Sequence, residues 1–152
     1  MIARHSPVDA EILFAVRHRL EPMAAATACE KLTPAVVRTL EQHLGKMQQA
    51  IPRRDLTTFL RHDLAFHECI WKMPQQHTLD RLFRLVLPSL YAFFYERFSR
   101  SLAENPSLVE QALQRQLEVY RKFLEVLKTR DRVKIRKTFG RVLAVNWQTV
   151  QI

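Results

Sequence analysis

Glycine scarcity is the feature that most limits what this chain can fold into. Only 2 of its 152 residues are glycine. A sheet protein of this size needs many tight turns, which favour glycine. Segments rich in Val, Ile and Thr also never alternate with turn signals. Because 47% of the residues are hydrophobic, the chain can bury a core in one domain. We therefore expect a single all-α domain.

Apolar residues recur at spacings of three and four along six segments, which is the period of an amphipathic helix. Thr33 and Asp131 are predicted N-caps, and the turn Asn105-Pro106-Ser107 is predicted to supply another. Pro22 predicts a kink or a local break inside the first helix, and Pro88 predicts a bend inside the fourth. Short connections imply antiparallel neighbours, so we predict an antiparallel bundle of about six helices. The bundle spans residues 8–150, with helices over about 8–30, 34–49, 55–72, 78–102, from the turn at 105–107 to 128, and 131–150. In the first helix, the apolar set comprises Ile12, Leu13, Val16, Leu20, Met23 and Thr27.

The predicted helix 55–72 carries an acid and an imidazole on its apolar side. A step of about 100° per residue places Asp63 and His67 one turn apart within the apolar arc. A buried ionised carboxylate is costly unless it is paired or ligated, so the bundle must supply a cation, a polar cavity with water, or a ligand. A hydrogen bond between the two residues, with no ligand, is the alternative. His62 and Cys69 point to other faces, so this helix offers no further ligand.

Two residues on other helices are placed to meet this pair. Tyr120 lies near the centre of the inward arc of the fifth predicted helix. Arg17 flanks the apolar face of the first and can reach into the bundle while its stem packs. Its guanidinium suits bidentate capture of a carboxylate. The same spacing also fits a surface arginine.

Three segments carry a recognisable pattern in a fixed order. Val16–Thr33 reads VRHRLEPMAAATACEKLT, with an Arg followed by Leu-Glu-Pro. Asp55–Ile70 reads DLTTFLRHDLAFHECI, with an acidic residue ahead of a Phe-His pair, and Leu117–Phe139 reads LEVYRKFLEVLKTRDRVKIRKTF. This order resembles the FCD domain, the effector-binding and dimerisation domain of FadR-type GntR transcription regulators of bacteria. The resemblance covers almost the whole chain. It implies a cavity for a small-molecule effector, a homodimer and no enzymatic activity.

The resemblance also implies where a metal would bind. Metal-containing members of the family hold a divalent cation, such as Zn or Ni, with one Asp and three His. It places the first two ligands on Asp63 and His67, the third on Tyr120 and the fourth on Val142, which cannot coordinate. Two protein ligands rarely hold a transition metal firmly. We therefore predict a metal-free cavity without a cofactor. The Asn of the family's Gly-Asn-Pro turn falls on Gln76.

The predicted ligand-binding residues are Arg17, Asp63, His67, Gln76 and Tyr120. Without a metal, an anionic ligand depends on Arg17, on His67 if it is protonated, and on Tyr120. We expect a small carboxylate or acyl effector. An apolar lining that includes Phe94 and Phe98, if they face inward, would also admit a larger hydrophobic molecule, and the sequence does not choose between these ligands. No nucleophile or oxyanion-stabilising element accompanies the Asp–His pair, so we expect no catalysis.

The chain is basic, with a formal net charge of +9, which permits an anionic partner. Arg130, Lys134, Lys137 and Arg141 recur at helical spacing and are predicted to form one stripe on the last helix. A solvated surface explains such a stripe. The alternative is contact with a nucleic-acid backbone, so a basic helical nucleic-acid-binding protein is our second hypothesis.

No helix-turn-helix or zinc finger is evident in the sequence. The segment before Val8 is too short for the family's winged helix, so we expect DNA contact only through a domain absent from this chain.

The remaining signals concern location and redox state. No apolar run approaches the roughly 18 residues of a membrane span. The N-terminal segment MIARHSPVDAE contains an acidic pair and does not read as a signal peptide. Cys29 and Cys69 match no metal-ligand spacing. We therefore expect reduced thiols in a cytoplasmic protein.

Overall fold

The computed structural model describes residues 7–152, and this range is an all-helical bundle. The expectations for the segment before Val8 fall almost entirely outside the described residues. The elements are α1 (Pro7–Ala28), the short 3-10 helix η1 (Cys29–Lys31), α2 (Pro34–Ala50), α3 (Leu56–Lys72), α4 (His77–Glu104), α5 (Pro106–Lys128) and α6 (Arg132–Val150).

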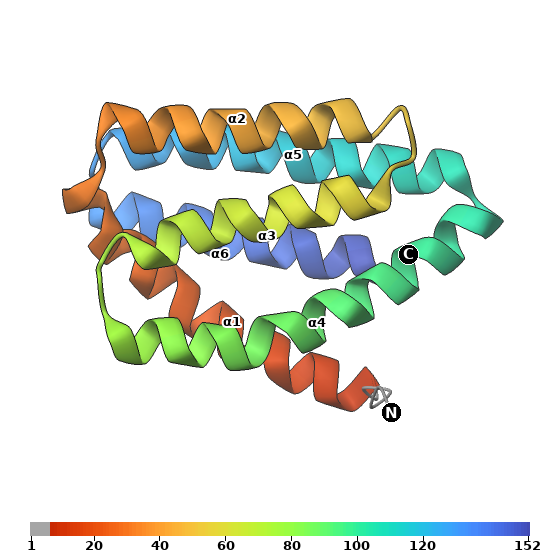
Figure 1. Cartoon of the computed structure of the whole chain (residues 1–152), viewed down its shortest axis with the longest axis horizontal. Coiled ribbons are helices and arrows are strands. Elements are labelled where there is room, and N and C mark those ends of the chain that lie inside the picture. The colour runs from red at the N-terminus through yellow and green to blue at the C-terminus, as the bar shows by residue number, and fades with distance from the viewer. Residues whose placement is uncertain (1–6) are drawn as a thin grey trace.

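Each α-helix runs back along the one before it, as Figure 1 shows. The helix α2 packs against α3 and α5, α6 packs against α5 and α1, and α4 packs against α3 and α1. The prediction of an antiparallel bundle of about six helices is confirmed. Its core lies between these helices, and α3, α5 and α6 supply most of the buried polar side chains described below.

The predicted helix starts are confirmed by their caps. Thr33 accepts a hydrogen bond from the Val36 amide, and Asn105 and Asp131 accept from amides three residues onward. Asp55, which the sequence placed inside the third helix, is instead its N-cap. Each such cap stabilises a helix by about 1 kcal/mol.

Three chain reversals use residues other than glycine in the left-handed region. Arg54, Gln75 and Arg130 have φ values of 54°, 56° and 58° and precede α3, α4 and α6. A residue with a Cβ costs about 1–2 kcal/mol in this conformation. Both glycines, Gly45 and Gly140, lie inside helices. The scarcity of glycine therefore predicted helices correctly, although the turns still adopt backbone that favours glycine.

The two internal prolines do not end their helices. The helix α1 continues through Pro22 to Ala28 before the change to η1, so no break occurs at that proline. The helix α4 contains Pro88, and Figure 1 shows this helix changing direction along its length. A bend is expected there because proline removes a backbone donor and its ring clashes with the preceding turn.

The apolar set predicted for α1 is divided between the core and the surface. Ile12, Val16 and Met23 are exposed, although they are large and hydrophobic. The buried face instead carries Phe14 and Ala24, together with polar residues discussed below. The spacing was read correctly as helical, but it did not identify the face that meets the core. The helix α1 therefore carries apolar side chains both on its buried side and on its exposed side.

Two smaller predictions concern the cysteines and the membrane. Cys29 is buried and Cys69 half-buried, and neither forms a disulfide. Within residues 7–152, no helix is long and apolar enough to span a bilayer.

A histidine pair joins α2 to α3 away from the buried cluster. Nδ1 of His43 lies 3.0 Å from Nδ1 of His62, so one ring donates and the other accepts. This contact fails when both rings are charged. Burial lowers the pKa of His43, and burial lowers that of His62 with help from His43, Arg61 and Lys46.

The lowered pKa values predict a loss of stability in mild acid. The unfolded chain takes up protons near the ordinary value of 6.5, whereas the folded histidines take them up only at lower pH. The contribution of this histidine pair to the free energy of unfolding should therefore fall as the pH drops from about 7.5 to about 5.5. Urea unfolding should show a smaller fall for His62→Gln, whereas the exposed control His77→Gln should behave like the wild type. Equal pH dependence in wild type and His62→Gln would contradict this origin.

Candidate functional site

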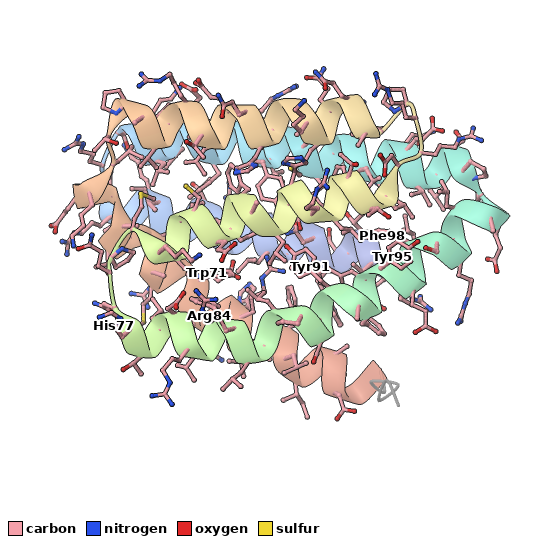
Figure 2. The ribbon with its side chains drawn as sticks, viewed as in Figure 1. Trp71, His77, Arg84, Tyr91, Tyr95 and Phe98 are labelled. Atoms are coloured by element: carbon pink, nitrogen blue, oxygen red, sulfur yellow. The ribbon has the colours of Figure 1, made fainter. Side chains whose placement is uncertain are left out.

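Asp63 is buried on α3 and accepts three hydrogen bonds. Its exposed fraction is 1%, and its Oδ2 atom accepts from the Tyr91 hydroxyl at 2.5 Å. Its Oδ1 atom accepts from the Tyr120 hydroxyl and, at 3.3 Å, from Nε2 of Gln116. Tyr91 belongs to α4 and lies on the side that faces α3 (Figure 2). These donors, from α4 and α5, replace the water that a carboxylate loses on burial.

His67, one turn after Asp63, connects Tyr120 to a buried acid on α1. Its Nε2 atom lies 2.6 Å from the Tyr120 hydroxyl, and its Nδ1 atom lies 2.7 Å from Oε2 of Glu21. The second contact is not aligned as a good hydrogen bond and is best described as an ion pair. Asn146, on α6, donates to the same Tyr120 oxygen at 2.8 Å.

The donors and acceptors in this network require a charged His67. Tyr120 has one hydroxyl hydrogen, and the Asp63 carboxylate receives it. The Tyr120 oxygen therefore accepts from Asn146 and from a protonated Nε2 of His67. The Nδ1 atom faces the carboxylate of Glu21, which can only accept, so this nitrogen also carries a hydrogen. We infer from these contacts that His67 is an imidazolium.

Glu21 and Arg17 are both ionised in the interior. Burial raises the pKa of Glu21, but Arg17 and His67 together lower it below its usual value. Burial lowers the pKa of Arg17, but Glu21, Tyr91, Tyr120 and Asp63 together raise it by more, so the net shift is upward. With His67 protonated and Asp63 ionised, the cluster holds two cations, Arg17 and His67, and two anions, Glu21 and Asp63. Its net charge is zero.

Both tyrosines are held in their neutral form. Burial raises the pKa of Tyr91 and of Tyr120 well above the usual value, and the negative charge of Asp63 adds to this effect. Each hydroxyl therefore keeps the hydrogen that it donates to Asp63.

Arg17 has buried donors that no described residue satisfies. Its exposed fraction is 0%, its Nε atom donates to Glu21 at 2.6 Å, and its Cζ atom lies 5.6 Å from the centroid of the Tyr91 ring. Its Nη1 and Nη2 atoms have no hydrogen-bond partner in the described part of the chain. The acceptors Oε1 of Gln116 and Oδ1 of Asn146 are also buried there without a partner. An unsatisfied buried polar group costs about 1–3 kcal/mol, so these atoms are suited to a polar ligand.

The cluster is closed to solvent. Exposed fractions range from 0% for Arg17 and Tyr120 to 8% for Tyr91. The side chains come from α1, α3, α4, α5 and α6, so a ligand can reach Arg17 only if the packing between these helices opens.

The residues present do not fit the metal site of the family. The Asp63 oxygens are already hydrogen-bonded to tyrosines and an amide, and His67 has a hydrogen on each nitrogen in this network. A coordinating imidazole needs a free lone pair. Val142 is buried but has no ligand atom. Within the described residues, no group of three His, Cys, Asp or Glu is placed to hold a metal ion.

Four of the five predicted site residues lie together. Arg17, Asp63, His67 and Tyr120 are joined directly or through Glu21. Gln76 does not join them, because it is an exposed residue at the N-cap of α4. The structure therefore does not place Gln76 with the other predicted site residues. Another glutamine, Gln116 of α5, supplies the amide that contacts Asp63.

Four members of the cluster were not predicted as site residues. Glu21 follows Arg17 by four residues, and this spacing is typical of a surface ion pair. Tyr91 lies among many apolar residues of α4, so nothing in its sequence context distinguished it from a core residue. Gln116 precedes Tyr120 by four residues on α5, so helical spacing was the available signal that it lies on the same side. Asn146 lies at helical spacing between buried apolar residues of α6, so a polar residue in a core position was the available signal.

The chain was compared with known protein families, curated proteins and solved structures. The sequence profile of the FCD domain matches residues 11–144. The transcription regulator McbR of Escherichia coli K12, described as an HTH-type transcriptional regulator, is 28% identical over 135 residues. That alignment covers 86% of this chain and 56% of McbR, so the chain spans about half the length of this relative.

A solved structure supports the fold. The structure described as E. coli McbR/YncC matches with a TM-score of 0.81 at 22% identity, over 96% of this chain and 66% of that one. The FCD domain belongs to transcription regulators and not to an enzyme class.

Proposed function

Because this chain belongs to the FCD domain family, we propose that it is the effector-binding domain of a transcription regulator. One observation carries the proposal: the guanidinium of Arg17 is fully buried, and both of its Nη atoms lack partners in the described residues. A carboxylate accepts from both Nη atoms at once, which suits this geometry. We therefore propose a small carboxylate as the effector.

The polar residues around Arg17 define the rest of the proposed ligand site. Gln116 and Asn146 each present an unpartnered carbonyl oxygen, so a hydroxyl or amide on the ligand would satisfy them. Asp63, His67 and Tyr120 hold these groups in place through their hydrogen bonds and contact a ligand once the site opens. Since the site is closed, ligand entry requires the packing between these helices to open, which gives the domain a way to transmit binding.

DNA contact is proposed to lie outside these residues. The relative McbR is described as an HTH-type regulator, and the chain covers 56% of it. We propose that this chain supplies the sensing part of a regulator of that type.

A carboxylate effector should raise the melting temperature of this domain. A ligand at 100 times its Kd stabilises a protein by about 2.7 kcal/mol, which corresponds to about 5–10 °C for a domain of this size. A thermal-shift series with small mono- and dicarboxylates measures this effect. The double variant Arg17→Met/Glu21→Gln should lose it, because the guanidinium is gone while the buried net charge stays zero.

A matched control separates this effect from a general loss of arginine. Arg54→Met removes an exposed arginine that pairs with Glu110 and should keep the ligand response. The proposal is abandoned if no carboxylate stabilises the wild type, and the role of Arg17 is abandoned if the double variant responds fully.

We also propose that the domain forms a homodimer through α1 and α4. These helices pack against each other, and Figure 1 shows both along one edge of the bundle. Ile12, Val16 and Met23 of α1 and Leu82 and Leu85 of α4 are exposed there. Large apolar side chains that gather on neighbouring helices favour association with another protein surface.

Sedimentation velocity tests this interface. Wild type should sediment as a dimer, and Leu85→Glu should sediment as a monomer because the substitution places charges in the apolar face. Val133→Glu is a matched control, since Leu85 is 76% exposed and Val133 on α6 is 78% exposed. A monomeric wild type, or equal behaviour of the two variants, would rule out this dimer.

The alternative function, nucleic-acid binding, has weaker support. Lys134, Lys137 and Arg141 are exposed on α6. Arg130 was predicted to lie on the last helix. It lies instead in the turn before α6, where its side chain donates a hydrogen bond to the carbonyl of Leu32. The stripe is therefore shorter than expected, and surface charges of this kind are usually solvated.

A further inference from the structure

Glu21 occupies the position between the two buried cations of the site. Its Oε1 atom accepts from Nε of Arg17 at 2.6 Å, and its Oε2 atom lies 2.7 Å from Nδ1 of His67. Its side chain is 2% exposed, and those of Arg17 and His67 are fully buried. An external carboxylate would use the same two cationic groups. Glu21 therefore has the contacts expected of a bound carboxylate.

The charge of the cluster makes Glu21 and an external carboxylate competitors. With Glu21 and Asp63 ionised and Arg17 and His67 protonated, the interior is neutral. A second carboxylate beside Arg17 would leave one negative charge uncompensated and without water, which is strongly unfavourable. Neutrality is kept if the incoming carboxylate replaces Glu21.

We infer that Glu21 is an internal carboxylate ligand that holds the site closed, and that the effector's carboxylate displaces it. This inference rests on the proposed effector-binding function. Because Glu21 lies on α1, its displacement breaks the direct ion pair of α1 with His67 on α3, and the ligand then joins His67 to Arg17 in its place. The same helix exposes Ile12, Val16 and Met23. Displacement of Glu21 thus couples ligand binding to the helix that carries the proposed dimer face.

The test replaces the internal ligand with a free one. Glu21→Ala removes a group the size of acetate and leaves Arg17 and His67 without their anion. The variant should melt below the wild type in sodium chloride, and sodium acetate at equal ionic strength should restore at least half of the difference. The wild type should respond little to acetate, because Glu21 already fills the position.

Two control variants separate a specific site from a general salt effect. Glu21→Gln loses the charge but keeps the volume, so acetate has no room and should not restore stability. Glu110→Ala removes the exposed partner of Arg54 and should be insensitive to acetate. The inference is overturned if acetate acts on Glu21→Ala no more than chloride does, or if it acts equally on all three variants.

The experiment is also informative if Glu21→Ala does not fold in chloride. If Glu21→Ala is unfolded in chloride, circular dichroism is followed as acetate is added. Folding that requires acetate supports the inference. No folding at any acetate concentration, while Glu21→Gln folds, overturns it.

The outcome is distinguishable from a failure of the proposed function. If acetate rescues Glu21→Ala but no carboxylate stabilises the wild type, the internal ligand stands and the effector role falls. If carboxylates stabilise the wild type through Arg17 but acetate does not rescue Glu21→Ala, the effector role stands and the internal ligand falls.

Discussion

The fold is organised around one chain of buried contacts, which runs from Asp63 through Tyr120 and His67 to Glu21 and Arg17. A charged side chain is stable away from water only when protein groups replace its hydrating water. Each residue in this chain of contacts therefore depends on its neighbour in the chain. Together with the hydrogen bonds of Tyr91 and Asn146, the network joins five of the six α-helices in residues 7–152. A change at any one residue of the network therefore alters contacts between several helices, which suits a domain that responds to a ligand.

Helix periodicity and capping residues were enough to predict the architecture. The caps at Thr33, Asn105 and Asp131 are local, since each side chain bonds an amide three residues away. The juxtaposition of Asp63 and His67 was also predictable, because both lie on one helix at a spacing of four. Local rules govern all these features, so one sequence suffices to find them.

The partners of that pair depend on how helices pack, which the sequence does not specify. Spacing says which residues share a side of a helix, but not which side meets the core. For α1 the apolar set at Ile12, Val16 and Met23 favoured one side, while Arg17 and Glu21 face inward on another. Glu21 looked like half of a surface pair, and only the approach of α3 makes it a partner of His67.

The protonation of His67 tests the account most directly, because neutrality of the cluster depends on it. A nitrogen NMR spectrum of isotopically labelled protein at neutral pH reports the hydrogens on each histidine ring. The signal of His67 among the six histidines is assigned by its loss in His67→Gln. The account predicts that both ring nitrogens of His67 carry a hydrogen. A neutral ring with one bare nitrogen would contradict it, because the network would then lack its second cation.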